Sequence, residues 1–224
     1  MHDLRLLNKE SGLVIEQLLD QAKSDRFIMF RKIIYSLPHF IFKQKDETEI
    51  KNYVMHKVCV PVCTETGNFL HMITRILKPE KVVEFGTSFG VSTIFLASAL
   101  EKNNKGLLIT SEIDEYKVQL AKQHFLKAKI AHRIEIRNGD ALQTLSNIEN
   151  IEFLFLDGWK ELYLPLFKIL EPKLSENAII IADDIIKLSK QTIDFCKYIQ
   201  SKPDKYSSTI LEIGDGLLFC TKQK

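Results

Sequence analysis

The chain has 224 residues, a length that one α/β domain fills, and its 45% apolar and 27% charged residues form an ordinary globular mixture. The 31 lysines and arginines nearly balance the 29 aspartates and glutamates, so a net charge of +2 gives no strong field for gathering nucleic acid or an anionic membrane. The composition argues against a nucleic-acid-binding protein and favours a small-molecule partner.

The N-terminus carries no recognisable targeting signal. Met1 is followed by His2, Asp3 and Arg5 without an apolar signal region, and no later stretch reaches the roughly 18 apolar residues of a membrane span. We therefore expect a cytoplasmic protein without stable membrane insertion.

The first 60 residues contain no run typical of a strand. They predict helices that break near Pro38 and again near Pro61. We expect residues 1–60 to form a helical cap that belongs to the same domain as residues 61–224.

Within this cap, the segment RFIMFRKIIYSLPHFIFK at 26–43 alternates cationic and large apolar residues. A helix lying on a membrane surface has this pattern, but so does a helix that packs on a sheet or on the second subunit of a homodimer. The packed helix is the commoner case, so a homodimer is a reasonable expectation.

The four cysteines stand at positions 59, 63, 196 and 220. The CVPVC spacing of Cys59 and Cys63 lacks the second close pair that a structural zinc site needs. Reduced thiols in a reducing compartment are the simpler interpretation.

From Lys81 onward, short apolar runs alternate with longer amphipathic stretches, the pattern of βα units. The predicted strands are VVEF at 82, LLIT at 107, RIEI at 133, EFLFL at 152, AIIIA at 178, STILEI at 208 and LLFCT at 217. The predicted helices are 91–102, 114–128, 160–170 and 189–201. Gly214-Asp215-Gly216 suits a tight hairpin between the last two strands. The sequence therefore predicts an α/β fold with a Rossmann-like, doubly wound, seven-stranded sheet, mostly parallel with one antiparallel C-terminal strand.

A glycine-containing turn, Glu84-Phe-Gly86-Thr-Ser-Phe-Gly90-Val-Ser92, joins the first strand of this sheet to a helix. Ligands bind at this edge of doubly wound sheets, and glycines let them approach the backbone. Glu112 ends the second strand, where a carboxylate can bind both ribose hydroxyls of an adenosine; a solvated strand-end acid is the alternative.

The cofactor that this turn suits is not a dinucleotide. The turn lacks the G-x-G-x-x-G spacing that a pyrophosphate requires, which disfavours a nicotinamide-dependent oxidoreductase. An acid at Glu84 instead suits the cationic amino end of a methionine moiety. Asn138-Gly139-Asp140 after the third strand could border an adenine, although an Asx turn alone would also explain it.

Acidic residues gather after the fourth and fifth strands. Asp157, with Trp159 and Lys160, follows FLFL, and Asp183 and Asp184 follow IIIA. Three carboxylates that converge at one edge need a neutralising lysine or a hard cation, and oxygen ligands suit Mg²⁺. Helix capping by the Asp pair, a core role for Trp159 and an ordinary first-turn Lys160 are the alternatives.

These motifs resemble the catechol O-methyltransferase and caffeoyl-CoA O-methyltransferase group of small class I methyltransferases, from about residue 62 to the C-terminus. The segments that carry the resemblance are VVEFGTSFGVST, the acid in LLITSEID, LDGWKELYLP, IADD and IGDGLLF. The resemblance implies transfer of a methyl group from S-adenosylmethionine to a hydroxyl of a small molecule.

The resemblance also assigns roles to residues. It implies that the cofactor lies among Val62, Thr66, Glu84, Gly86, Ser92, Glu112, Asp140, Asp157 and Trp159. It implies that Asp157, Asp183 and Asp184 bind a divalent metal ion, and that Lys160 is the general base, with Asp157 as its catalytic partner. Cap residues from Phe27 to His56 are expected to line the acceptor pocket.

Two departures bear on these roles. The family usually has Asn where this chain has Asp184, which puts the metal affinity in doubt. Catechol O-methyltransferase has His where Gly158 stands and binds the catechol with a glutamate for which Glu212 is only a weak counterpart. A methyltransferase acting on nitrogen or a carboxylate without metal, or a non-catalytic cofactor-binding module, are the remaining alternatives.

Overall fold

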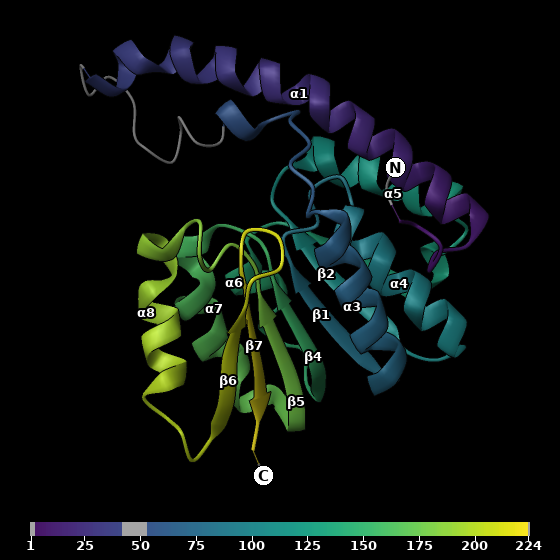
Figure 1. Ribbon diagram of the computed structural model, residues 1–224, viewed down its shortest axis with the longest axis vertical. Helices are drawn as coiled ribbons and strands as arrows, with labels where there is room; N and C mark the ends of the chain where they lie inside the picture. Colours follow the sequence, from purple (N-terminus) through teal and green to yellow (C-terminus); the bar gives the residue numbers. More distant parts are fainter. Residues whose placement is uncertain (1–2, 42–52, 224) are drawn as a thin grey trace.

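A seven-stranded sheet forms the centre of the computed structural model, which describes residues 3–41 and 53–223 (Figure 1). The strands are β1 Lys81–Phe85, β2 Leu107–Glu112, β3 Ile134–Asn138, β4 Ile151–Leu156, β5 Leu174–Ala182, β6 Tyr206–Leu211 and β7 Leu217–Lys222. Their order is β3-β2-β1-β4-β5-β7-β6, and β7 pairs antiparallel with both of its neighbours. The predicted fold is confirmed. The antiparallel strand lies between β5 and β6, so β6 forms the edge.

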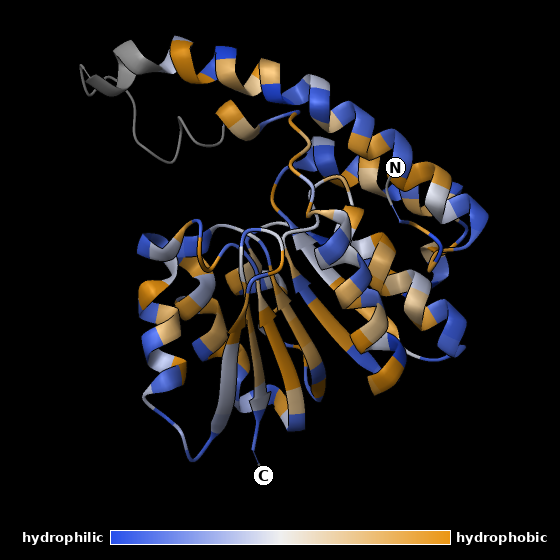
Figure 2. Cartoon of the chain, in the orientation of Figure 1, coloured by the Kyte–Doolittle hydropathy of each residue, from blue (hydrophilic) through white to orange (hydrophobic). Residues whose placement is uncertain are grey.

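Helices cover both faces of the sheet. They are α1 Lys9–Ile41, α3 Thr64–Leu77, α4 Val91–Asn103, α5 Glu115–Lys127, α6 Ala141–Thr144, α7 Tyr163–Leu170 and α8 Ser189–Gln200. Successive strand residues alternate between two cores: Val82 packs with α3, α4 and α5, whereas Val83 packs with α6, α7 and α8. Because parallel strands are buried on both faces, they appear as continuous apolar runs, coloured orange in Figure 2.

Sequence reasoning identified no helix between Pro61 and Lys81, but α3 occupies Thr64–Leu77. Cys63 caps its first turn, since the thiol sulfur accepts a hydrogen bond from the Thr66 N–H. Leu70, His71 and Thr74 form part of its buried face against α4. The expected break near Pro61 is confirmed, because residues 58–63 contain no helix.

The cap is built mainly of α1, which continues to Ile41. The break expected near Pro38 is therefore not seen, because α1 continues through Pro38 to Ile41, the last described residue before 53. Val14, Ile15 and Leu18 of its first half join the core beside α4 and α5.

The second half of α1 extends over the carboxyl edge of the sheet and exposes large apolar side chains (Figures 1 and 2). Phe27 is 66% exposed, Phe30 57% and Tyr35 77%. Across the described residues, we find no helix with the length and hydropathy of a membrane span. The remainder of the expected cap, 42–52, lies outside the described residues.

Candidate active site

A cavity of about 1290 Å³ opens at the carboxyl edge of β1, β2, β4 and β5, beneath α1 and the segment 53–62. Its wall contains all but one of the predicted site residues: Val62, Thr66, Gly86, Ser92, Glu112, Asp140, Asp157, Trp159, Lys160, Asp183 and Asp184. The cap contributes Arg26, Tyr53, Met55 and His56, so part of the expected Phe27–His56 lining lies at the cavity, while Phe27 itself points to solvent.

The glycine turn brings β1 close to β4. Gly86 has a φ of +102°, and a Cβ there would lie 2.8 Å from the backbone carbonyl carbon of Asp157. Gly90 has a φ of +91°, and a Cβ there would meet the ring of Phe125 at 2.5 Å. An L side chain rarely adopts such φ values, and here it would also clash. Both glycines are therefore required by backbone conformation and space.

Glu84 is the predicted site residue that does not line the cavity. Its carboxylate is fully buried and accepts hydrogen bonds from the hydroxyls of Ser92 at 2.6 Å, Thr93 at 2.6 Å and Thr110 at 2.7 Å. Burial raises its pKa to about 7 against the lowering effect of these bonds. In this structure Glu84 lies behind Ser92, which itself reaches the cavity.

Glu112 is held by two backbone amides. Its Oε2 accepts from the Ser88 N–H at 2.8 Å, and its Oε1 accepts from the Asp114 N–H at 2.9 Å. A carboxylate oxygen has two lone pairs, so each oxygen keeps one for a further donor such as a hydroxyl. The fixed orientation suits recognition of a diol at this wall of the cavity.

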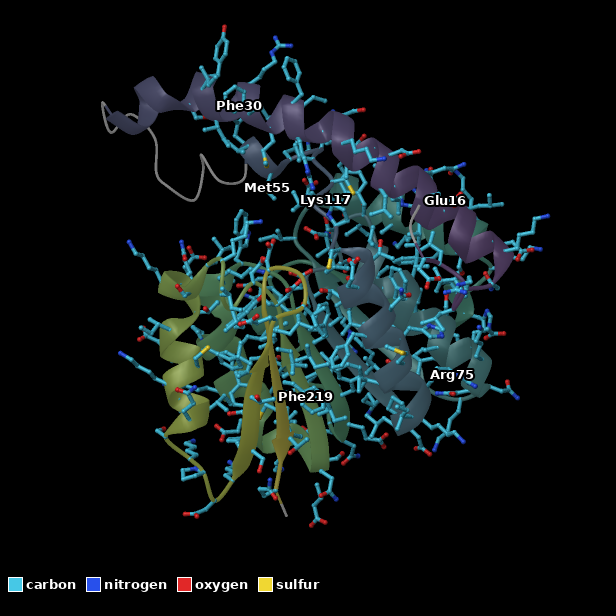
Figure 3. All side chains as sticks on the ribbon, in the orientation of Figure 1. Glu16, Phe30, Met55, Arg75, Lys117 and Phe219 are labelled. Carbon is cyan, nitrogen blue, oxygen red and sulfur yellow. The ribbon has the colours of Figure 1, made fainter. Side chains whose placement is uncertain are left out.

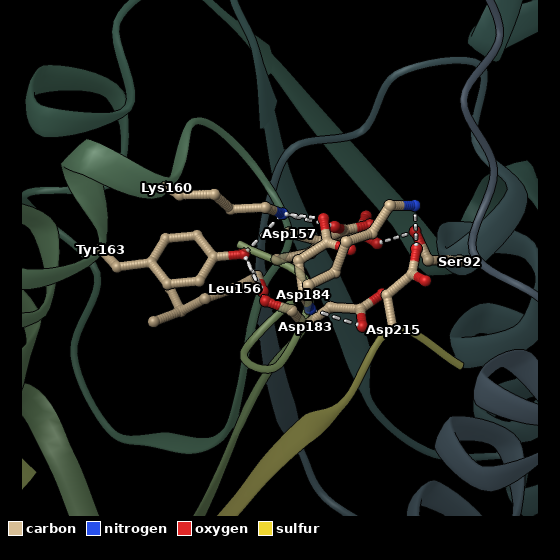
Figure 4. Close-up of polar contacts among 10 residues, drawn as sticks. Ser92, Leu156, Asp157, Lys160, Tyr163, Asp183, Asp184 and Asp215 are labelled. Carbon is tan, nitrogen blue, oxygen red and sulfur yellow. Dashed lines mark hydrogen bonds and ion pairs between the residues drawn. The ribbon is translucent and has the colours of Figure 1, made fainter. Parts of the chain in front are cut away.

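Lys160 reaches across the acidic end of the cavity (Figure 4). Its Nζ lies 3.1 Å from Oδ1 of Asp157 and 2.9 Å from Oδ2 of Asp184, and its side chain is only 9% exposed. Burial alone would lower the pKa of Lys160, but the Asp157 and Asp184 carboxylates hold it well above its usual value. The two carboxylates therefore favour the protonated form of Lys160.

Asp183 is nearly buried beside this pair. Its Oδ1 accepts from the Asp184 N–H at 2.7 Å, and burial, with the Asp157 and Asp184 carboxylates close by, raises its pKa to about 8. Burial likewise raises the pKa of Asp157, against the opposing charge of Lys160. Among residues 3–41 and 53–223, no three His, Cys, Asp or Glu side chains are grouped closely enough to hold a metal ion.

Tyr163 is a site residue that sequence reasoning missed. Its buried hydroxyl accepts a hydrogen bond from Lys160 Nζ at 2.8 Å and donates to the Leu156 carbonyl at 2.8 Å. The signal was the spacing in KELY, since residues three apart share a face on a helical turn. Tyr163 therefore fixes the direction of the Lys160 side chain.

The structure shows what surrounds Gly158 and Glu212, the positions at which the sequence departs from catechol O-methyltransferase. A Cβ at Gly158 would meet the ring of Phe85 at 2.4 Å, so Phe85 occupies the space that a histidine would need. Glu212 is exposed and does not line the cavity, whereas Asp215 of the same hairpin does. Asp140 lines the cavity and also caps α6, because its Oδ1 accepts from the Leu142 N–H at 2.9 Å.

A doubly wound sheet with a glycine turn, a strand-end acid and a carboxylate–lysine cluster at its switch edge has the architecture of Rossmann-like cofactor-binding proteins. A family model described as O-methyltransferase matches residues 33–223. The chain belongs to this O-methyltransferase family.

Similar proteins carry related names. The chain is 29% identical over 136 residues to a catechol O-methyltransferase of Niastella koreensis, a match that covers 58% of this chain and 61% of that protein. It is 26% identical over 184 residues to caffeoyl-CoA O-methyltransferase 2 of Zea mays, covering 71% and 69%. The solved O-methyltransferase from Bacillus cereus in complex with S-adenosylhomocysteine (SAH) is similar at 26% identity and a TM-score of 0.62, covering 70% of this chain and 80% of that one.

Proposed function

We propose that the protein transfers the methyl group of S-adenosylmethionine to a hydroxyl of a catechol-like small molecule. The observation that carries the proposal is the Lys160 amino group between Asp157 and Asp184, which lines the same cavity as the Glu112 carboxylate. Glu112 would bind the cofactor ribose, and the Lys160 end would receive the acceptor hydroxyl. The names of the similar proteins support this reaction class.

The donor set at this end suits a divalent cation in chemistry and charge, but in the described residues the three carboxylates are not yet grouped as a metal site, so binding would have to draw them together. Asp157, Asp183 and Asp184 supply carboxylate oxygens, the ligands that Mg²⁺ prefers. Three carboxylates and one ammonium carry a formal charge of −3 + 1 = −2 when ionised. A cation would compete with Lys160 for the same carboxylates. When bound, it would polarise the acceptor oxygen and favour its anion.

Lys160 would act as the general base. It can accept a proton only when the charges of Asp157 and Asp184 are balanced by something other than its own ammonium. Its bond to Tyr163 keeps Nζ on the cavity wall. Positioning of the acceptor oxygen against the sulfonium methyl supplies the rest of the rate enhancement, because the donor is already reactive.

Transfer of labelled methyl from S-adenosylmethionine to catechol, with and without Mg²⁺ and in chelator, tests this proposal. We expect a methyl ether and SAH in equal amounts, with Mg²⁺ and not in chelator. SAH binding without transfer to any hydroxyl would favour a non-catalytic module, and full activity in chelator would remove the metal from the proposal.

A further inference from the structure

Lys117, in the first turn of α5, is a buried lysine that lines the cavity. Figure 3 shows it beneath α1. The residue is 7% exposed, and its Nζ lies 5.9 Å from the centroid of the Phe89 ring. Within the described part of the chain, no carboxylate or other hydrogen-bond acceptor lies at bonding distance from Nζ. A buried amino group without a hydrogen-bond acceptor is costly, so this position favours an anionic ligand in the cavity.

The carboxylates around Lys117 form their hydrogen bonds with other groups. Glu115 accepts from the Gln119 amide, and the buried Asp25 of α1 accepts from the Cys59 N–H. Asp114 binds Nδ1 of His56 at 2.7 Å through one oxygen and caps α5 through the other, at the Tyr116 N–H. Glu112 accepts from the backbone amides of Ser88 and Asp114. None of these carboxylates hydrogen-bonds to Nζ of Lys117, although Asp114 lies near enough for the Lys117 charge to contribute to the lowered pKa of its carboxyl.

A second feature of the same wall also favours an anion. The 13-residue helix α4 begins after Gly90, whose position provides no side-chain cap, and its first residues, Val91 and Ser92, line the cavity. Free N–H groups at a helix N-terminus attract negative charge. Phe89, which Lys117 contacts, directly precedes Gly90, so the ammonium and the helix N-terminus lie on one side of the cavity.

We propose that Lys117 binds the carboxylate of the methionine moiety of the cofactor. This inference rests on the proposed function, in which the cavity holds S-adenosylmethionine. The cofactor is favoured over the acceptor as the source of the carboxylate because Lys117 lies beside Phe89 of the glycine turn, in the half of the cavity that contains Glu112. Asp157, Lys160 and Asp183 form the other half. Lys117 is then a residue that selects adenosine ligands with an amino-acid tail.

A comparison of two ligands isolates this contact. SAH carries the carboxylate, whereas 5′-methylthioadenosine carries the adenosine and sulfur without the amino-acid tail. Calorimetric titration of both ligands into the wild type, Lys117→Met, Lys117→Arg and Lys122→Met separates the contributions. Lys122→Met is the matched control, because Lys122 is an exposed lysine on the same helix.

We expect Lys117→Met to weaken SAH binding about 10- to 100-fold, the range of a charge-assisted hydrogen bond, and to leave 5′-methylthioadenosine binding within about twofold. Lys117→Arg should retain most of the SAH affinity. The ligand-free Lys117→Met protein should melt no lower than the wild type, because a thioether replaces an unpaired buried charge.

Equal losses for both ligands, or unchanged SAH binding in Lys117→Met, would overturn the role of Lys117. If Lys117→Met binds SAH normally but no longer binds acceptors that carry a carboxylate, the role is also overturned, because Lys117 would then bind the acceptor. If the wild type itself fails to bind SAH, the proposed function fails instead, so the two failures are distinguishable.

Discussion

The Nζ of Lys160 lies 2.9 Å from Oδ2 of Asp184, a residue whose backbone adopts the left-handed conformation with a φ of +62°. This turn directs the Asp184 carboxylate back toward the lysine on the neighbouring loop. Because Asp157 binds the same ammonium, Lys160 joins the loops after β4 and β5 and neutralises part of their charge. The site therefore contains its own cation, whose removal would leave the two carboxylates unbalanced.

Lys160→Met should separate catalysis from binding. We expect turnover with catechol to fall about 10²- to 10⁴-fold, the usual contribution of a general base. SAH affinity should stay within about twofold, and Mg²⁺ should bind more tightly because its competing ammonium is gone. Steady-state kinetics and calorimetry provide the readouts, with the exposed Lys190→Met as the control. Unchanged turnover would exclude Lys160 as the base.

Asp184→Asn should weaken metal binding without disturbing the turn. Asparagine tolerates the left-handed conformation, so the backbone is kept while the site loses one negative charge. We expect Mg²⁺ affinity in the SAH-saturated protein to fall about tenfold, and the exposed Asp194→Asn to leave it unchanged. Equal Mg²⁺ affinities for the wild type and Asp184→Asn would show that the charge of Asp184 does not contribute to metal binding.

Gly86→Ala should disrupt the cofactor wall. The added Cβ meets the Asp157 backbone and requires a φ of +102° that alanine rarely adopts, so we expect the free energy of unfolding to fall by roughly 1–3 kcal/mol and SAH binding to be lost. Gly12→Ala in α1 is the control: nothing lies within 4 Å of its Cβ, and helix propensity should raise stability by roughly 0.5–1 kcal/mol. Normal SAH binding by Gly86→Ala would refute the close approach at this turn.

Glu84 should make stability fall as the pH rises. Its folded pKa of about 7 exceeds the ordinary value of 4.5, so its protonated form favours folding below pH 4.5 and this contribution is lost as the pH passes 7. We expect urea unfolding from pH 5 to 8 to show a decrease that Glu84→Gln lacks, by at most roughly 3 kcal/mol. Parallel curves for the two proteins would mean that Glu84 does not titrate in this range.

Glu171, in the short turn Glu171–Lys173 that directly precedes β5, should make stability fall as the pH falls. Burial would raise its pKa, but bonds from Lys205, Tyr198, Tyr206 and Lys202 lower it to about 2. Its contribution to stability is therefore present above pH 4.5 and is lost as the pH falls toward 2. Glu171→Gln should unfold more easily at pH 7 with unchanged SAH affinity, and the deficit should shrink between pH 5 and 3. A deficit that is constant with pH would contradict this account.

The sequence predicted the seven strands well, because their apolar runs reflect burial on both faces of a parallel sheet. It also placed Asp157, Lys160 and Asp184 at one edge, since the carboxyl ends of such strands meet there. The helix α3 was not predicted because it precedes the alternating strands and helices, which begin at Lys81. Contacts between side chains were also beyond sequence reasoning, as in Tyr163 under Lys160 and the ring of Phe85 beside Gly158. These contacts depend on rotamers and long-range packing that local patterns do not specify.

The orientation of Glu84 illustrates the same limit. Its position beside the glycine turn is visible in the sequence, but the hydroxyls of Ser92, Thr93 and Thr110 that surround it come from α4 and β2. Likewise, nothing in the spacing of EIDEYK distinguishes Lys117 as the buried lysine of α5. The homodimer and the cytoplasmic location stay predictions.

The most direct test of O-methylation is the identity of the bond that receives the methyl group. The protein, Mg²⁺ and [¹³C-methyl]S-adenosylmethionine would be incubated with catechol, caffeoyl-CoA, an aromatic amine and an aromatic carboxylate, and the labelled carbon followed by NMR. The account predicts methyl ethers of the two hydroxyl acceptors, no N-methyl or methyl ester product, and no ether with Lys160→Met. Transfer to the amine or the carboxylate, or SAH binding without any ether, would contradict it.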